Sequence, residues 1–274
     1  MLANEYGALK IPEDVAKLVR LEQELRKKNM TLDLIGLIPI ETQYAYAITP
    51  IDVIPFANTG GDGIHFGFLT DFGRISNLAE APIVCVTPTD DPPIRLMARS
   101  LDEFLQMATS VPHVELLERF WPGTDEEKIT NEMEEFLTDE FDRVREPIRS
   151  RLRETFQKES VDVASCIRQA MDERQQVIAL PTLDGLGVVA YQDEVAEKRY
   201  TFNPNRSQDE QELANMRIFL EGANVTEKLA FVRDASYWYI LAPDYDDKIL
   251  QLIREILHTL QLEDEFKRLE FRNN

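Results

Sequence analysis

The stretch from Phe56 to Gly73 constrains the fold of this chain most, because it holds five of the chain's 11 glycines. The Gly-Gly-Asp-Gly run at residues 60–63 can take positive φ at little steric cost, which predicts a tight turn. Large apolar residues then alternate over 64–68, a period of two that predicts a strand with one face in the core. A second glycine-containing corner at 71–73 closes the strand. The apolar residues of this strand are Ile64, Phe66 and Phe68, and His65 is expected to face outward between them.

Short apolar runs separated by Pro, Gly, Asn or Asp continue this strand pattern on both sides of the turn. The connections are too short for repeated helical crossovers, so the sequence predicts a mostly antiparallel sheet rather than a doubly wound parallel one. A helix is expected on each side of the sheet, one from Ile11 to about Lys28 and one after Ser100, where Glu103 completes a capping-box spacing. The expected strands are 32–40, 44–48, 53–57, 64–69, 83–86 and 94–98.

The fold class predicted for the whole chain is α+β, in three parts. Residues 1–110 form the sheet domain, residues 111–176 form a helical segment in which Pro147 restarts a helix, and residues 177–274 form a smaller α+β unit. In this last unit we expect strands at 177–180 and 186–191, a helix at 208–221, a hairpin pairing 229–232 with 237–241, and a final helix from Pro243. The final helix carries an apolar stripe formed by Ile249, Leu252, Ile253, Ile256, Leu257 and Leu260.

Charge is the strongest global signal. Fifty acidic residues against 30 basic ones give a net charge of −20, which argues against binding to nucleic acid, since phosphates need basic patches. Residues 125–146 concentrate this charge, with ten acidic and three basic residues and a local balance of −7. Such a run forms either a solvated helix face or an electronegative docking surface for a basic partner.

The residues that could carry chemistry gather around the central strand. Histidine beside carboxylates can act as a general base or a metal ligand, so Asp62, His65 and Asp71 give a catalytic alternative. The glycine run enters a strand and lacks the lysine of a phosphate-binding loop, and no Gly-x-Ser-x-Gly turn is present. The sequence therefore predicts no catalytic residue, no metal site and no cofactor. Instead it predicts an acidic partner-binding rim formed by Asp62, His65, Asp71, Asp90 and Asp91.

The cysteines and the apolar runs indicate a cytoplasmic protein. Cys85 lies in a strand pattern and Cys166 in a helical one, without CxxC spacing, which is typical of structural thiols in a reducing compartment. The first ten residues have no long apolar core, so no secretory signal is expected. No apolar run approaches the roughly 20 residues that a membrane-spanning helix requires.

The order of short motifs in the first domain resembles the SUKH superfamily, which includes fungal cell-wall-synthesis regulators and many bacterial immunity proteins. The resemblance spans residues 11–108, and its most specific pieces are the turn at 60–63 and the Ser-Leu-Asp-Glu-Phe-Leu run at 100–105. Two departures stand out: Asn29-Met30-Thr31-Leu32 follows the first helix where many members carry Asn-Gly-Gly, and the region after Ser110 has no recognised counterpart.

The resemblance implies an α+β domain that binds protein without turning over a substrate. Bacterial members typically neutralise toxins, often nucleases, and a basic nuclease would suit an acidic partner. We therefore expect an immunity protein that blocks a basic toxin. The alternatives are a regulatory or scaffold protein with another partner, and an enzyme using Asp62, His65 and Asp71. The stripe of the final helix leaves homo-oligomerisation open.

Overall fold

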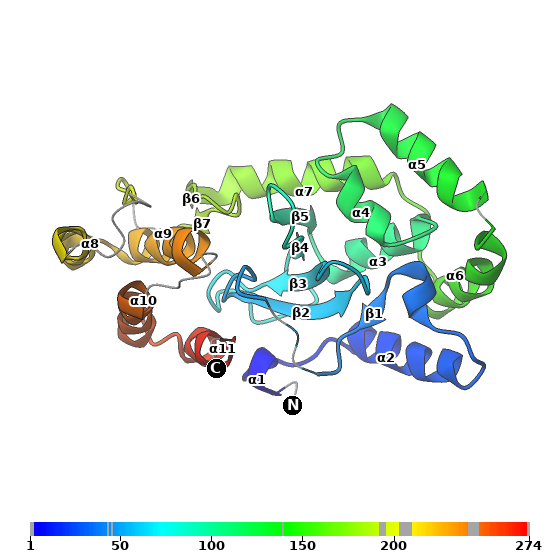
Figure 1. Cartoon of the computed structure of the whole chain (residues 1–274), viewed down its shortest axis with the longest axis horizontal. Helices are drawn as coiled ribbons and strands as arrows, with labels where there is room; N and C mark the ends of the chain where they lie inside the picture. The colour runs from blue at the N-terminus through cyan, green and yellow to red at the C-terminus, as the bar shows by residue number, and fades with distance from the viewer. Residues whose placement is uncertain are drawn as a thin grey trace.

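The computed structural model describes residues 3–42, 44, 46–138, 140–191, 196–202, 210–240 and 247–272. A five-stranded antiparallel sheet lies at its centre, in the order β1-β2-β3-β4-β5, so each strand pairs with the next one in the sequence. The chain is α+β, as predicted, and helices surround the sheet (Figure 1). The strands are β1 (Ile38–Pro39), β2 (Val53–Asn58), β3 (His65–Leu69), β4 (Ile83–Val86) and β5 (Ile94–Ala98).

One face of the sheet packs against helices that precede the strands in the chain and against helices that follow them. Phe56, Phe66 and Phe68 point into this core, where the ring of Phe104 on α3 meets Phe56 edge-on with centroids 5.3 Å apart. Their burial confirms that the alternating apolar side of β3 faces the core. The helices that contribute to this core are α1 (Ala3–Tyr6), α2 (Glu13–Arg26), α3 (Leu101–Ser110), α4 (Glu115–Phe120), α6 (Asp142–Phe156) and α7 (Val163–Val177), with the 3-10 helix η1 (Leu32–Ile35) beside them.

The opposite face of the sheet is also buried, which the sequence did not predict. Val53, Leu69 and Val84 form a second cluster there with Ala170 of α7 and with Leu186. Figure 1 shows α7 as a long helix that runs along the sheet and ends at β6. The expectation that His65 faces outward is therefore wrong: its side chain is fully buried on this second face.

The C-terminal part packs around its own core, which also takes in Ile51 and Phe72 from the sheet domain. The apolar stripe of α10 lies inside this core, so within this chain it is already covered. The elements are the two-stranded sheet of β6 (Ile178–Leu180) and β7 (Val188–Val189), then α8 (Glu210–Gly222), α9 (Val225–Ala235), the π-helix η3 (Ser236–Ile240), α10 (Asp247–Thr259) and α11 (Glu263–Arg272).

Several predicted elements differ from the structure. Residues 32–35 form η1 rather than a strand, because Thr31 accepts a hydrogen bond from the Asp33 N–H and Gly36 ends the turn at φ 66°. The described residues of 44–48 are not in a strand. The hairpin predicted at 229–241 is wrong, since 225–235 is helix α9 and 236–240 is the π-helix. Leu241 and the start of the final helix at Pro243 lie outside the described residues.

Two sequence signals, the capping-box spacing at Ser100 and the helix restart at Pro147, predicted the structure only in part. Ser100 caps α3 by accepting from the Glu103 N–H at 3.3 Å, but Glu103 reaches back to the N–H of Arg99 rather than to that of Ser100. Pro147 lies inside α6, which begins five residues earlier at Asp142. The three-part division at residues 110 and 176 stays a prediction; in the structure α6 and α7 share a core with the sheet.

The glycine turn forms as predicted. Gly60 and Gly63 take φ of 87° and 71°, and Asp62 between them takes 48°. A side chain at Gly63 would meet the ring of Tyr46 at 2.7 Å, so both its backbone and its surroundings require glycine.

Candidate functional site

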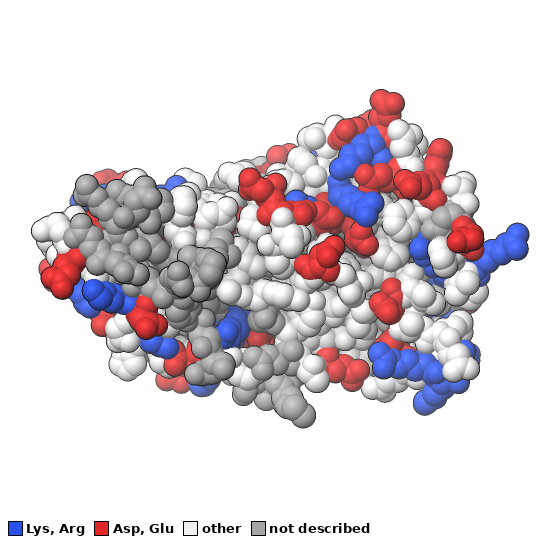
Figure 2. Space-filling model, viewed as in Figure 1, with Lys and Arg blue, Asp and Glu red and all other residues white. Residues whose placement is uncertain are grey.

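Helix α5 (Glu126–Thr138) carries an acidic face on the outside of the molecule. None of its described side chains is fully buried, and Figure 2 shows acidic side chains gathered where Figure 1 places α5. The nearby basic residues pair elsewhere, since Arg119 binds Glu115 at 2.6 Å and Lys128 lies 3.8 Å from Glu132. We define the acidic face as six exposed residues whose carboxylates pair with no lysine or arginine side chain among those described: Asp125, Glu126, Glu127, Glu134, Glu135 and Glu140.

Exposed apolar side chains lie at the end of this face, where α5 turns into α6. Arg145 connects them: its Nε donates to the Leu34 carbonyl at 3.2 Å, and its guanidinium lies 5.8 Å from the Phe141 ring centroid. The N–H of Val144 donates to the Phe141 carbonyl at 3.0 Å. We define the apolar patch by its four members, with exposed fractions of 39% for Leu34, 47% for Leu137, 56% for Phe141 and 50% for Val144.

A second group of carboxylates lies in the interior, between the sheet domain and the C-terminal helices. Arg233 of α9 donates from Nη2 to Asp52 at 2.5 Å and from Nη1 to Asp184 at 3.0 Å. All three side chains are 3% exposed or less. Burial alone would lower the pKa of Arg233, but the surrounding aspartates raise it, so the guanidinium keeps its charge.

Asp71 belongs to the same interior group. Both of its carboxylate oxygens accept from Arg174 of α7 at 2.7 Å, and Oδ1 lies 3.9 Å from Arg233. Asp71 and Phe72 have φ of 49° and 55°, a region that side chains rarely adopt. This corner is held by contacts with both arginines, because the Arg233 guanidinium also stacks over the Phe72 ring at 4.9 Å. We call Asp52, Asp71, Asp184, Arg174 and Arg233 the buried ion cluster.

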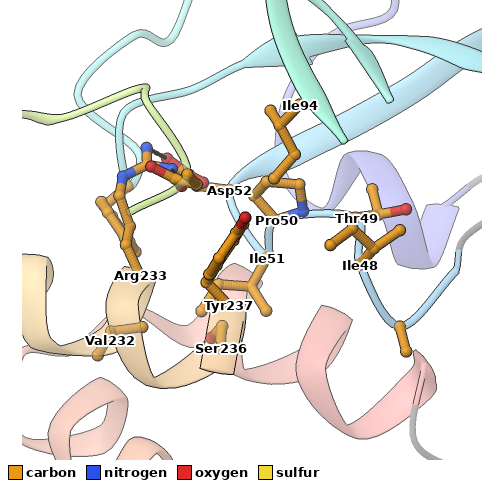
Figure 3. Close-up of a pocket in the computed structure, with 13 residues that line it drawn as sticks. Ile48, Thr49, Pro50, Ile51, Asp52, Ile94, Val232, Arg233, Ser236 and Tyr237 are labelled. Carbon is orange, nitrogen blue, oxygen red and sulfur yellow. Dashed lines mark hydrogen bonds and ion pairs between the residues drawn. The ribbon is translucent and has the colours of Figure 1, made fainter. Parts of the chain in front are cut away.

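A narrow cavity of about 20 Å³ lies beside the buried ion cluster, under the segment 47–52. Figure 3 shows Asp52 and Arg233 at one end of it, with the Tyr237 ring rising from the π-helix toward Pro50. Asp52 Oδ1, Arg233 Nε and Ser236 Oγ are buried without a hydrogen-bond partner in the described part of the chain. The cavity has room for about one water molecule and is too small for a substrate.

His65 has two hydrogen bonds that define its tautomer. Nδ1 lies 2.7 Å from the Gly63 carbonyl and must donate to it, so Nε2 accepts from the Thr49 hydroxyl at 3.0 Å. Burial lowers the pKa of His65 to about 4. The imidazole is therefore neutral and fully engaged near pH 7, with no nitrogen left for a proton transfer or a metal.

The five residues predicted to form an acidic rim do not form one group. His65 and Asp71 are buried and lie at opposite ends of β3, while Asp62, Asp90 and Asp91 are exposed. Asp90 pairs with Arg95 at 3.0 Å. Their role in contacting a partner stays a prediction, but burial removes His65 and Asp71 from the surface that a partner could touch.

The sequence did not identify the buried ion cluster, although a local signal marks the helix that supplies Arg233. Asn224 and Glu227 form a complete capping box at the start of α9, with the Glu227 N–H donating to Asn224 at 2.9 Å and the Asn224 N–H donating to Glu227 at 3.0 Å. The spacing of these two residues predicts a helix start. A helix predicted from this spacing would have replaced the hairpin expected over 229–241.

Comparison with models of protein families and with curated proteins finds no match to this chain. Among the described residues, no group of three or more His, Cys, Asp or Glu side chains could hold a metal ion. Cys85 and Cys166 are both free thiols. In the same part of the chain, no helix combines the length and the apolar character needed to cross a bilayer.

Proposed function

We propose that this chain is a non-enzymatic protein-binding module that recognises a basic protein through the acidic face. The observation that carries the proposal is the set of six exposed carboxylates without cationic partners in the described chain. Asp125 supports the fold, because its Oδ1 accepts from the Lys128 N–H at 2.9 Å at the start of α5. Glu134, Glu135 and Glu140 lie beyond the first turn, where neighbouring carboxylates repel one another and add no stability. An oppositely charged partner relieves the repulsion and is attracted from a distance.

The most concrete form of this function is a bacterial immunity protein that neutralises a basic, nuclease-type toxin. The resemblance of residues 11–108 to the SUKH superfamily supports this form, as does the net charge of −20. The two free thiols favour a reducing cytoplasm as its location. A regulatory or scaffold protein with a basic partner other than a toxin is the alternative.

The test uses the protein encoded by the adjacent gene. The full chain is titrated into that protein, and binding is measured by calorimetry at 50 and 300 mM NaCl. We expect tight stoichiometric binding that weakens with salt, because screening removes the electrostatic attraction. If the neighbouring protein is a toxin, its activity should fall to zero at one equivalent.

Charge-reversal variants assign the surface. Glu126→Lys/Glu127→Lys should weaken binding at least tenfold, through a slower association rate. The matched control is Glu13→Lys/Glu24→Lys, which changes the net charge equally on the exposed side of α2. An equal loss of affinity in the two double variants would contradict the proposal. The absence of binding to any neighbouring gene product would also contradict it.

A further inference from the structure

The apolar patch lies in an unusual place for large apolar side chains. Three of its members fall within eight residues of chain at the corner between α5 and α6, next to the most acidic of the described helices. Single exposed apolar residues are ordinary on protein surfaces, whereas grouped ones with a polar rim are typical of interaction sites. The patch therefore needs an explanation beyond the packing of the core.

The patch is held in place by structured elements. Arg145 connects η1 to the corner through its bond to Leu34 and its stacking on Phe141, and it also lies 5.2 Å from the Phe136 ring centroid. The following turns of α6 are anchored by Ile148 and Leu152, which are buried in the main core. A partner that docks here meets a preformed surface, so little ordering of this chain opposes binding.

The charges around the patch define the chemistry of its occupant. Exposed carboxylates lie on both sides of it, with Asp33 beside Leu34 on η1 and with Glu134 and Glu140 before and after Leu137, while the exposed Arg143 lies between Phe141 and Val144. An apolar surface alone would attract any apolar partner. Arg145 also lies over Phe141, so three exposed carboxylates face two arginines at this corner. The balance stays negative, and the patch matches a polypeptide in which lysines or arginines flank a protruding apolar side chain.

We propose that the apolar patch is the anchor point for the basic partner, and that it receives an apolar side chain flanked by cationic residues. This inference rests on the proposed function and assigns separate roles to the acidic face and the apolar patch. The acidic face speeds association by long-range attraction, while the apolar patch slows dissociation by burying side chains out of water. Aromatic residues dominate such anchors, so Phe141 carries the largest share.

The test compares two synthetic peptides of equal charge, one of lysine and leucine in helical amphipathic order and one with alanine in place of leucine. Binding to the full chain is measured by fluorescence anisotropy. We expect the leucine peptide to bind at least tenfold tighter. Leu137→Ser/Phe141→Ser should abolish this difference while leaving the alanine peptide's affinity unchanged. The matched control is Ile218→Ser, which removes a 66% exposed apolar side chain from α8 and should change neither affinity.

The outcomes separate this inference from the proposed function. If both peptides bind equally to the unchanged chain, or if Leu137→Ser/Phe141→Ser keeps the leucine preference, the anchor is contradicted while the basic-partner function stands. If neither peptide binds at low salt, the proposed function itself fails. Circular dichroism of Leu137→Ser/Phe141→Ser checks that the helices remain, and the alanine peptide shows that the acidic face is intact.

Discussion

Carboxylates occupy two opposite environments in this protein. In the buried ion cluster, Asp52, Asp71 and Asp184 each meet an arginine at 3.0 Å or less. On the acidic face, six exposed carboxylates pair with no described lysine or arginine side chain. The same functional group therefore joins two parts of the chain in one place and remains open to solvent and to partners in the other.

The difference follows from solvation. A carboxylate in water needs no protein partner, whereas a buried one loses several kcal/mol of solvation unless a cation and hydrogen bonds replace the water. The buried ion cluster therefore depends on every one of its members. Apart from Asp125, which caps the start of α5, the acidic face can lose a charge at almost no cost to stability, which leaves it available for binding.

The largest effect is expected from breaking the buried ion cluster. Arg233→Met removes the partner of Asp52 and Asp184 and leaves two buried carboxylates without their guanidinium. We expect a loss of about 3–5 kcal/mol in the free energy of unfolding. Urea denaturation followed by circular dichroism measures it.

The matched control is Arg254→Met, which removes an arginine whose pair with Glu270 is about one-third exposed on both sides. This variant should cost less than about 1 kcal/mol, since exposed pairs contribute little. A similar loss of unfolding free energy in both variants would show that burial does not increase the contribution of an ion pair to stability.

The second effect concerns acid, which destabilises the fold through the buried His65. The pKa of His65 is lowered by burial from 6.5 to about 4 in the folded chain. Between these pH values the unfolded chain binds a proton that the folded chain does not, so stability falls as the pH drops from 6.5 toward 4. The full contribution is about 3 kcal/mol, reached below pH 4.

Denaturation at pH 7.0 and at pH 4.5 measures this contribution in the unchanged chain and in His65→Gln. The variant should be less stable at pH 7 but should lose less stability on acidification. His258→Gln, at an exposed position of α10, should behave as the unchanged chain does. An identical pH dependence of stability in all three proteins would mean that burial on the second sheet face does not lower the pKa of His65.

The sequence predicted the sheet far better than the interior ion pairs. Strands β4 and β5 match their expected bounds, since short apolar runs between turn residues are a local signal. Helix α9 was missed because Leu229–Val232 is a short, fully buried apolar run, in which period alone does not separate helix from strand.

The buried ion cluster could not be predicted for a different reason. Asp52 and Arg233 are 181 residues apart in the chain, and neither lies in a motif. Charged residues are usually exposed, so their types predict solvent contact rather than burial. The acidic face, by contrast, was visible in the sequence as the run 125–146, because exposed charge on a helix needs no distant partner.

An intermediate case sharpens the comparison between the two environments. Glu227 is buried, but backbone N–H groups surround it in place of arginine: Lys198 donates at 2.9 Å, Asn224 at 3.0 Å and Glu197 at 3.1 Å. Burial opposes its ionisation, yet these bonds outweigh burial and lower its pKa. Glu227→Gln keeps the shape and removes the charge, and we expect a loss of about 2 kcal/mol. Urea denaturation at pH 7 measures it, and a loss as large as that of Arg233→Met would contradict this ranking.

The smallest effect on stability is expected on the acidic face, where the effect on binding is the larger one. Glu134→Gln/Glu135→Gln removes two exposed charges from α5, and the free energy of unfolding should change by no more than about 0.5 kcal/mol. The same variant should weaken binding of the lysine–alanine peptide severalfold at 50 mM NaCl. At 300 mM NaCl the difference from the unchanged chain should shrink, because ions screen exposed charges. A loss of stability with unchanged peptide binding would assign these carboxylates to the fold and would place them with the buried ion cluster instead.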